Sequence, residues 1–417
     1  MEYNIGPSPA STTLNLYNAQ EYVTTPLWNV IGIINGTIPE EVVIIGNHRD
    51  AWIVGGAGDP NSGSAAINEV IRSIGIAMSQ GWKPQRTIVF ASWDGEEYGL
   101  IGSTEWVEEY VPWLKNSTVA YINVDVGARG DEFHASAAPL LNKAIYEATG
   151  LVPSPNQTVS GQSVGDVWDG RISTMGSGSD FTAFQDFAGI PSIDIGFGAS
   201  SSDAVYHYHS NYDSFYWMDH FGDAKWQYHT ACAQILALLL AKLVETPVIH
   251  FNATDYALGL GKYLDSVKAA ANTSDSGPSH AIFAPLDHAV TSLLHTSHEF
   301  DAQASSLSHS LSHTLSTELS PLIAHERSKL YARVRAINAK YKYLERQFLY
   351  EPGLDSRTWF KHVVFAPGLW TGYAGATFPG MVEAIADADR RALRKWADIA
   401  RGAIESAEKL LAEGVMV

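Results

Sequence analysis

The sequence has almost no cysteine and no long apolar run. Its 417 residues contain a single cysteine, Cys232, so no disulfide can form within the chain. Cys232 lies in an apolar run of helical character, and a lone thiol there is typical of a packing residue rather than a nucleophile. No apolar stretch is long enough to cross a bilayer, so we expect no transmembrane segment in this chain.

Basic residues are also scarce compared with acidic ones. The chain has 27 lysines and arginines against 45 aspartates and glutamates, which gives a net charge of −18 at pH 7. Because such a surface repels phosphate groups, nucleic acid and anionic membranes are excluded as main partners. The hydrophobic content of 46% is ordinary for a globular protein, and the length allows two domains.

Short apolar strands alternate with helical segments from about residue 28 to residue 245. This alternation predicts an α/β fold, a three-layer sandwich with a mainly parallel sheet covered on both faces. The predicted strands are residues 30–34, 42–46, 87–93, 119–126 and 192–195. Apolar residues at helical spacing predict helices over residues 65–78, 138–148 and 224–245.

Strands are expected to stop after about residue 250. Helical patterns cover residues 256–270, 282–319, 321–350 and 383–413. We therefore predict a first domain over residues 1–247 and a helical domain over residues 248–417. Four histidines of the helical part are interpreted as a solvated face, because no acidic partner recurs at matching spacing; they are His295, His298, His309 and His313.

Ligand-type side chains gather where the predicted strands of the first domain end. In an open α/β sheet, ligands bind beyond the carboxyl ends of the strands. Each side chain alone is typical of a turn or a solvated helix start, but together they predict a site. Asp50 follows His48 by two residues, a spacing that suits a carboxylate orienting an imidazole. The gathered residues are His48, Asp59, Glu96, Glu97 and Asp125.

The motifs around these residues resemble a known family. They are VVIIGNHRD (42–50), GDPNSG (58–63), DGEEYGLIGS (94–103) and AYINVD (120–125), followed by GSGSDF (176–181), YHS (208–210) and YAGATFPG (373–380). They resemble the co-catalytic zinc peptidases, which include glutamate carboxypeptidase II, bacterial aminopeptidases and the transferrin receptor. The resemblance covers essentially the whole chain.

The resemblance implies two Zn²⁺ ions. One would be held by His48, Asp125 and a bridging Asp59, and the other by Asp59, Glu97 and His209. Nitrogen and carboxylate ligands with one open position are what a catalytic zinc needs. The resemblance also implies a cis bond between Asp59 and Pro60.

The resemblance implies roles for further residues. Glu96 would be the general base, and Tyr208 would line the pocket and donate to the oxyanion. Ser179, Tyr373 and Asp194 would face the substrate. A Ca²⁺ ion would be held in part by Glu105 and Glu108.

The sequence departs from glutamate carboxypeptidase II where that enzyme recognises an acid. Gly372 replaces a lysine, Asp194 and Gly196 replace two arginines, and Ser179 replaces an asparagine. Each lost charge-assisted bond is worth about 1.5–3 kcal/mol, so a strict preference for C-terminal glutamate is not expected. Asp194 would either face the cleft and accept a basic group, or pair elsewhere, for instance with Arg171.

The chain begins at a segment that follows the apical insertion of the family. We therefore expect the apical domain and the first part of the peptidase domain to be absent or on another polypeptide, with which this chain would associate. The helical domain would form a homodimer through exposed apolar faces in residues 331–350 and 391–411. Five glycosylation sequons favour a lumenal or extracellular place, vacuolar or on the ectodomain of a membrane-anchored parent; they begin at Asn35, Asn116, Asn156, Asn252 and Asn272.

The predicted function is a two-zinc exopeptidase, either carboxypeptidase-like or an aminopeptidase, acting on peptides. Two alternatives stay open: an inactive binding protein like the transferrin receptor, and a single-zinc acyltransferase similar to glutaminyl cyclase. The complete ligand set together with Glu96 favours the peptidase over both.

Overall fold

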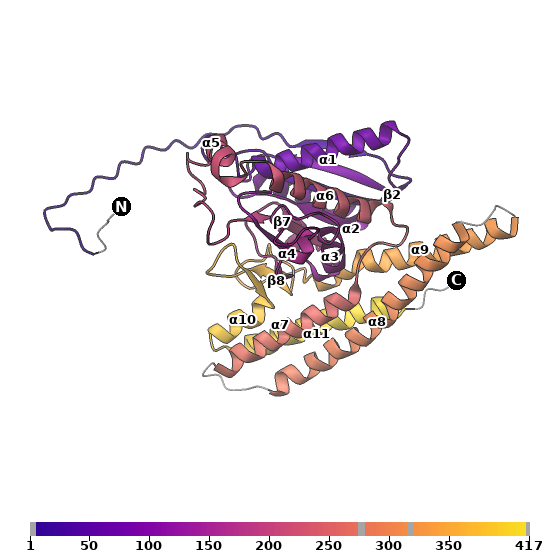
Figure 1. The fold of residues 1–417 in the computed structure, drawn as a ribbon. Helices are drawn as coiled ribbons and strands as arrows, with labels where there is room; N and C mark the ends of the chain where they lie inside the picture. Colours follow the sequence, from indigo (N-terminus) through magenta and orange to yellow (C-terminus); the bar gives the residue numbers. More distant parts are fainter. Residues whose placement is uncertain (1–5, 274–279, 316–320, 414–417) are drawn as a thin grey trace.

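A computed structural model describes residues 6–273, 280–315 and 321–413, and Figure 1 shows its fold. A seven-stranded sheet has the order β1-β3-β2-β4-β7-β5-β6. The four central strands β3, β2, β4 and β7 are parallel, while β1 and β5 run antiparallel to their neighbours β3 and β7. The mainly parallel sheet is confirmed. The strands are β1 (Val30–Ile34), β2 (Ile38–His48), β3 (Arg86–Trp93), β4 (Thr118–Asn123), β5 (Glu132–Ala137), β6 (Ile172–Ser173) and β7 (Ser192–Gly198).

Helices cover both faces of the sheet because its central strands are apolar on both sides. Val43 and Ile45 of β2 pack with the helices α1 (Asn61–Ser79), α3 (Asn142–Thr149) and α6 (Gln227–Glu245). Val42 and Ile44, which alternate with them, pack on the other face with α2 (Ile101–Ser117) and the π-helical turn η2 (Ala183–Phe187). A near-continuous apolar run of this kind is typical of a parallel strand buried on both faces.

Long helices make up most of the second half of the chain and lie along one side of the sheet domain (Figure 1). Their apolar residues continue the core that begins under α1 and α6, so sheet and helices share one hydrophobic interior. The helices are α7 (Ala253–Thr273), α8 (His280–Leu315), α9 (Pro321–Leu344), α10 (Pro379–Ala386) and α11 (Arg390–Ala412); the short helices α4 (Val164–Val167) and α5 (Phe215–Trp217) belong to the first half.

Three predictions of secondary structure were wrong. Strands do not stop after residue 250, since β8 (Phe365–Pro367) and β9 (Gly375–Thr377) form an antiparallel pair. The helix predicted over residues 383–413 is two helices, because the carboxylate of Asp389 caps α11 by accepting from the amides of Arg391 and Ala392. The strands β5 and β6 were not predicted; β5 alternates buried and exposed residues and has no long apolar run.

Several boundaries also differ from the prediction. The helix predicted over 138–148 opens as the 3₁₀ turn η1 (Pro139–Leu141), and the helix predicted to residue 350 ends at Leu344, followed by the 3₁₀ turn η4 (Glu345–Phe348). The strand predicted to residue 126 ends at Asn123, so Asp125 lies in the loop beyond it. That position places its carboxylate at the end of the sheet.

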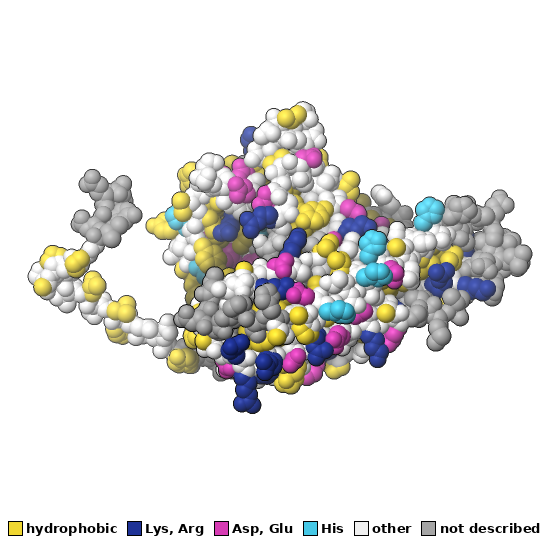
Figure 2. All heavy atoms as spheres, turned by 90° about the horizontal axis from the view of Figure 1, so that it is seen from below, with side chains coloured by type: hydrophobic (Ala, Val, Ile, Leu, Met, Phe, Trp, Pro, Cys, Tyr) yellow, Lys and Arg dark blue, Asp and Glu magenta, His cyan; other side chains and the backbone are white. Residues whose placement is uncertain are grey.

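The apolar faces proposed for dimerisation are not exposed. Along α11, Leu393, Trp396 and Ile404 are buried in the core of their own chain, and Ile337 and Tyr341 of α9 are buried as well. The underside of the helical region carries basic, acidic and histidine side chains interspersed with apolar ones (Figure 2). The prediction that these two apolar faces are exposed was therefore wrong, because their apolar residues pack inside the chain.

The histidines of α8 form no site in the described part of the chain. His295, His298 and His309 are exposed, and none joins a group of metal-type ligands there. His313 lies outside the described side chains. No described helix has the length and apolarity that crossing a membrane requires.

Residues 6–29 form an extended segment whose first part runs away from the sheet domain (Figure 1), while Trp28 and Asn29 at its end bond to Asp94 and Gly102. The apolar side chains of its first part are almost fully exposed, with Leu14 at 91%, Leu16 at 93% and Tyr17 at 86%, whereas Leu27 is 41% exposed. This segment thus leaves apolar surface uncovered.

Candidate metal centre

The predicted ligands meet at one edge of the sheet. His48 is the last residue of β2, Glu96 and Glu97 lie in the turn after β3, and Asp125 lies just beyond β4. Asp59 comes directly before Pro60 at the start of α1. Because β2, β3 and β4 are parallel neighbours, their carboxyl ends bring these side chains together.

Asp59 lies between two histidines. Its Oδ1 is 3.3 Å from Nε2 of His48, and its Oδ2 is 3.4 Å from Nε2 of His209. Each histidine has a second carboxylate of its own: Asp125 Oδ1 lies 2.9 Å from His48 Nε2, and Glu97 Oε2 lies 2.9 Å from His209 Nε2. The five side chains therefore form two half-sites that share Asp59. The bond between Asp59 and Pro60 is cis.

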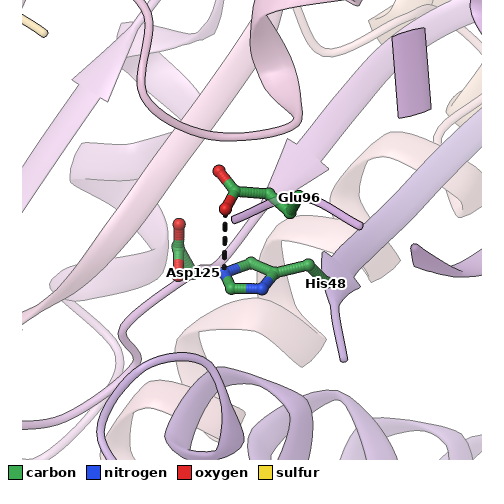
Figure 3. A group of neighbouring side chains, drawn as sticks. All are labelled: His48, Glu96 and Asp125. Atoms are coloured by element: carbon green, nitrogen blue, oxygen red, sulfur yellow. Dashed lines mark hydrogen bonds and ion pairs between the residues drawn. The ribbon is translucent and has the colours of Figure 1, made fainter. Parts of the chain in front are cut away.

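Glu96 points into the same cluster. Figure 3 shows its carboxylate directed at His48 beside Asp125, and its Oε2 lies 3.8 Å from His48 Nε2. Two groups of ligand atoms lie close enough to hold an ion, His48 with Glu96 and Asp125, and His48 with Asp59 and Glu97. Distances alone therefore do not separate Glu96 from the ligands.

The charges of the cluster suit a bound dication. Burial, together with the charge of the neighbouring Asp125, raises the pKa of Glu96 to about 9. Burial, together with the charge of Asp59, raises the pKa of Glu97 to about 7, and its Oε1 is buried without a hydrogen-bond partner. Crowded, desolvated carboxylates with two histidines are a donor set that fits Zn²⁺.

Asp50 supports the cluster in a different way from the one predicted. His48 Nδ1 donates to the main-chain carbonyl of Asp50 at 2.9 Å, whereas the Asp50 carboxylate is 3.6 Å from that nitrogen. The carboxylate instead accepts from the amides of Glu96 and Glu97, each at 3.1 Å. The main chain of Asp50 thus orients the imidazole, and its side chain positions the Glu96–Glu97 turn.

Two supporting residues were missed from the sequence. The buried carboxylate of Asp213 accepts from the amides of Gly58 at 2.7 Å and Asp59 at 3.0 Å, and so holds the loop that carries Asp59. Asn47 donates to the carbonyls of Pro60 and Asp125 and ties the two loops together. Asn47 precedes His48 and could have been suspected, but Asp213 is more than 150 residues from its partners and has no local signal.

Two cavities flank the cluster. The first, called the Glu96 cavity, has a volume of about 420 Å³ and is lined by Glu96, Glu97 and apolar side chains that include Leu100, Trp359 and Phe360. The second, called the Arg129 cavity, has a volume of about 480 Å³ and polar walls that include Arg129, His134, Ser179 and Asp194. Both cavities are bordered by Asp59, Asp125, Tyr208 and Tyr373. A substrate peptide that extends from one cavity into the other would therefore pass the cluster.

The predicted substrate-facing residues line these cavities. The hydroxyls of Tyr208 and Tyr373 lie 3.5 Å apart at the border of both. Ser179 and Asp194 each accept from the amide of Asn123, at 2.9 Å in both cases. The suggested pair between Asp194 and Arg171 is absent from the described ion pairs, because Asn123 is much closer in the sheet.

The glycines that replace the family's basic residues differ in their surroundings. Gly372 has φ of +66° and nothing within 4 Å of an added Cβ. At Gly196 an added Cβ would lie 2.2 Å from the carbonyl oxygen of Val126. A side chain at position 196 would therefore clash with the main chain.

The residues expected to help bind Ca²⁺ lie on α2. Glu105 and Glu108 are exposed, and Glu108 accepts from the indole of Trp359. Neither belongs to a group of metal-type ligands in the described ranges. The calcium site stays a prediction.

Comparison with known proteins identifies the family. The model of peptidase family M28 matches residues 29–235, and the model of the transferrin receptor-like dimerisation domain matches residues 281–412. The chain belongs to peptidase family M28. The first match contains all five candidate ligands and Glu96.

Three relatives show how far this M28 chain extends. A probable glutamate carboxypeptidase of Arthroderma benhamiae is 42% identical over 414 residues, which are 98% of this chain and 54% of the relative. Aminopeptidase NAALADL1 of Mus musculus is 33% identical over 96% of this chain and 54% of that protein. Vacuolar protein sorting-associated protein 70 of Saccharomyces cerevisiae is 31% identical over 94% of this chain and 49% of that protein. The chain thus spans about half the length of these relatives.

Proposed function

We propose that this chain is the catalytic part of a two-zinc exopeptidase. The observation that carries the proposal is the position of Asp59, whose two oxygens face two histidines that each have their own carboxylate. In this assignment, His48 and Asp125 would hold one ion and Glu97 and His209 would hold the other, with Asp59 shared. Zn²⁺ in such a site supplies Lewis acidity, which activates water and polarises a carbonyl.

The protein's own groups supply the proton transfers. Glu96 lines the Glu96 cavity, and we assign it as the base that takes a proton from the attacking water and gives it to the leaving amine. Asp50 keeps Glu96 in place through its amide. We assign Tyr208, at the border of both cavities, as the donor to the oxygen of the scissile carbonyl as negative charge develops on it.

The two alternatives fit the site less well. An inactive receptor has no physical need to keep five ligands and a buried Glu96 in one cluster. A single-zinc acyltransferase does not need two histidines on opposite oxygens of Asp59. The names of the relatives, glutamate carboxypeptidase and aminopeptidase, leave the polarity of attack open.

The Glu96 cavity is expected to accept an apolar leaving residue and to disfavour glutamate. Its described lining contains no lysine or arginine, and Leu100, Trp359 and Phe360 give it an apolar wall. Zinc-loaded protein should therefore hydrolyse N-acetylated dipeptides that end in leucine at least about tenfold faster, in kcat/KM, than those that end in glutamate. Dipeptides ending in lysine provide the control for charge.

This comparison also tests the proposed function. Hydrolysis that depends on zinc supports the exopeptidase, and a parallel set with a free amine and an amidated C-terminus gives the polarity of attack. A glutamate preference of tenfold or more would contradict the expected specificity. No cleavage of any peptide by protein with a full metal content would contradict the function itself.

We also propose a two-part chain in which residues 1–247 form the peptidase unit and residues 248–417 the dimerisation unit. The match to a transferrin receptor-like dimerisation domain supports the second unit, and a two-fold pair is the commonest soluble assembly. Light scattering at micromolar concentration should give twice the 45.4 kDa of one chain. The mass of a single chain throughout a dilution series would count against a dimer.

A further polypeptide segment is proposed to cover residues 6–29. The exposed Leu14, Leu16 and Tyr17 support this, as does the greater length of the relatives. We further propose a lumenal or extracellular location, supported by the exposed sequon asparagines Asn35, Asn116, Asn156 and Asn272 and by a yeast relative named for vacuolar protein sorting.

A further inference from the structure

Arg129 is a half-buried cation in the wall of the Arg129 cavity. It follows Asp125 by four residues, and both line this cavity with Asp59. Its guanidinium carbon lies 5.0 Å from the centre of the Tyr206 ring, and Tyr206 in turn donates to Asp213 at 2.9 Å. The arginine is therefore held by stacking on a side chain that is itself fixed.

The guanidinium of Arg129 has no anionic partner in the described part of the chain. None of the ion pairs within 4.0 Å there includes Arg129, and its Nε is buried without a hydrogen bond. Asp194, in the same cavity, is engaged by Asn123, and Asp213 is engaged by Gly58, Asp59 and Tyr206. A desolvated guanidinium with unused donors is matched to a planar anion such as a carboxylate.

The position of Glu96 decides which part of the substrate meets Arg129. Glu96 lines the Glu96 cavity and not the Arg129 cavity, so the leaving amine that receives its proton lies in the former. The residue that contributes the scissile carbonyl must then extend into the Arg129 cavity. Arg129 thus faces the acyl side of the cleaved bond.

We propose that Arg129 binds a carboxylate on the side chain of this acyl residue, so that the enzyme selects an aspartyl or glutamyl residue before the cleaved bond. The inference rests on the proposed exopeptidase function and names its substrate class. Desolvation in the cavity and the charge of Arg129 both lower the pKa of His134, which is therefore neutral at pH 7 and adds no second cation. A free amino group at this place would be repelled by Arg129, whereas a carboxylate is attracted to it.

The test compares substrates that differ only in that charge. N-acetyl-Glu-Leu and N-acetyl-Gln-Leu have the same shape, so their ratio of kcat/KM measures the contribution of the carboxylate. Wild-type protein should favour the glutamyl substrate by about 10- to 100-fold, the usual size of a charge-assisted pair. Arg129→Met should bring the ratio close to one with little change for the glutaminyl substrate, and Arg129→Lys should restore part of it. Arg171→Met, which removes an exposed arginine, is the matched control and should keep the wild-type ratio.

A structural role for Arg129 would give a different result. If its stacking on Tyr206 only supports the Asp59 loop, Arg129→Met would slow both substrates equally and leave the ratio unchanged, which would overturn the proposal. Calorimetric binding of N-acetylglutamate and N-acetylglutamine to zinc-loaded protein gives the same comparison without turnover. Equal affinities would reject the inference even if no peptide is cleaved, and equal cleavage of both substrates would reject it while the proposed function stands.

Discussion

Replacing Glu96 with glutamine is expected to lower kcat by about 10²- to 10⁴-fold while the protein keeps its zinc. The amide cannot take a proton from water, but it preserves the size of the side chain and its place above Asp50. Glu97→Gln is the matched control, because Glu97 lies 2.9 Å from His209 and is assigned as a ligand. That variant should lose metal first and activity as a consequence.

Metal analysis and single-turnover kinetics on both variants check this assignment. Glu96 Oε2 lies 3.8 Å from His48 Nε2, close enough for both to contact one ion, so the experiment decides between the two roles. Zinc lost from Glu96→Gln but retained by Glu97→Gln would reverse the roles of the two residues.

Replacing Asp59 with alanine should remove at least one of two zinc ions and reduce activity to background. Among the described ion pairs, Asp59 is the only carboxylate that contacts both His48 and His209. Inductively coupled plasma analysis should find two Zn²⁺ per chain in the wild type and one or none in Asp59→Ala. A wild-type protein that binds one zinc at saturation would contradict the two-metal proposal.

Asp213→Asn separates ligand loss from loop positioning in the same assay. This variant leaves Asp59 in place but weakens the acceptor for the amides of Gly58 and Asp59. We expect metal affinity to fall by about 10- to 100-fold with unchanged stoichiometry at saturation, the usual effect of losing an outer support. Full loss of metal would instead show that the loop cannot form without Asp213.

The sequence predicts the metal cluster better than it predicts the support around it. His48 and Asp125 follow apolar runs whose parallel pairing places their ends together, so the position of both follows from local pattern. The support that Asp213 gives, and the role proposed for Arg129, depend on contacts with residues distant in sequence or on a cavity, and no periodicity marks such contacts. Asp50 was predicted in part, because its spacing indicated that it supports His48. Only the structure shows that its main chain orients His48 while its carboxylate positions Glu96 and Glu97.

The sequence-based prediction of the helical half was wrong for another reason. An apolar stripe on a helix predicts burial but does not say against what, and α11 buries its stripe against its own chain rather than a partner. The break at Asp389 was likewise hidden, because a run of helix-favouring residues continues on both sides of it.

Two glycines, Gly372 and Gly196, stand where the resembling carboxypeptidase has basic residues. The two positions differ in how well they would accept a basic side chain. At Gly372 the surrounding space is open, so an engineer could install lysine at the cost of a left-handed backbone, about 1–3 kcal/mol. At Gly196 the carbonyl of Val126 occupies the space of any Cβ, and Val126 neighbours the proposed ligand Asp125. An arginine there would push the main chain next to Asp125, so a cation could not be installed at position 196 without disturbing the proposed metal centre.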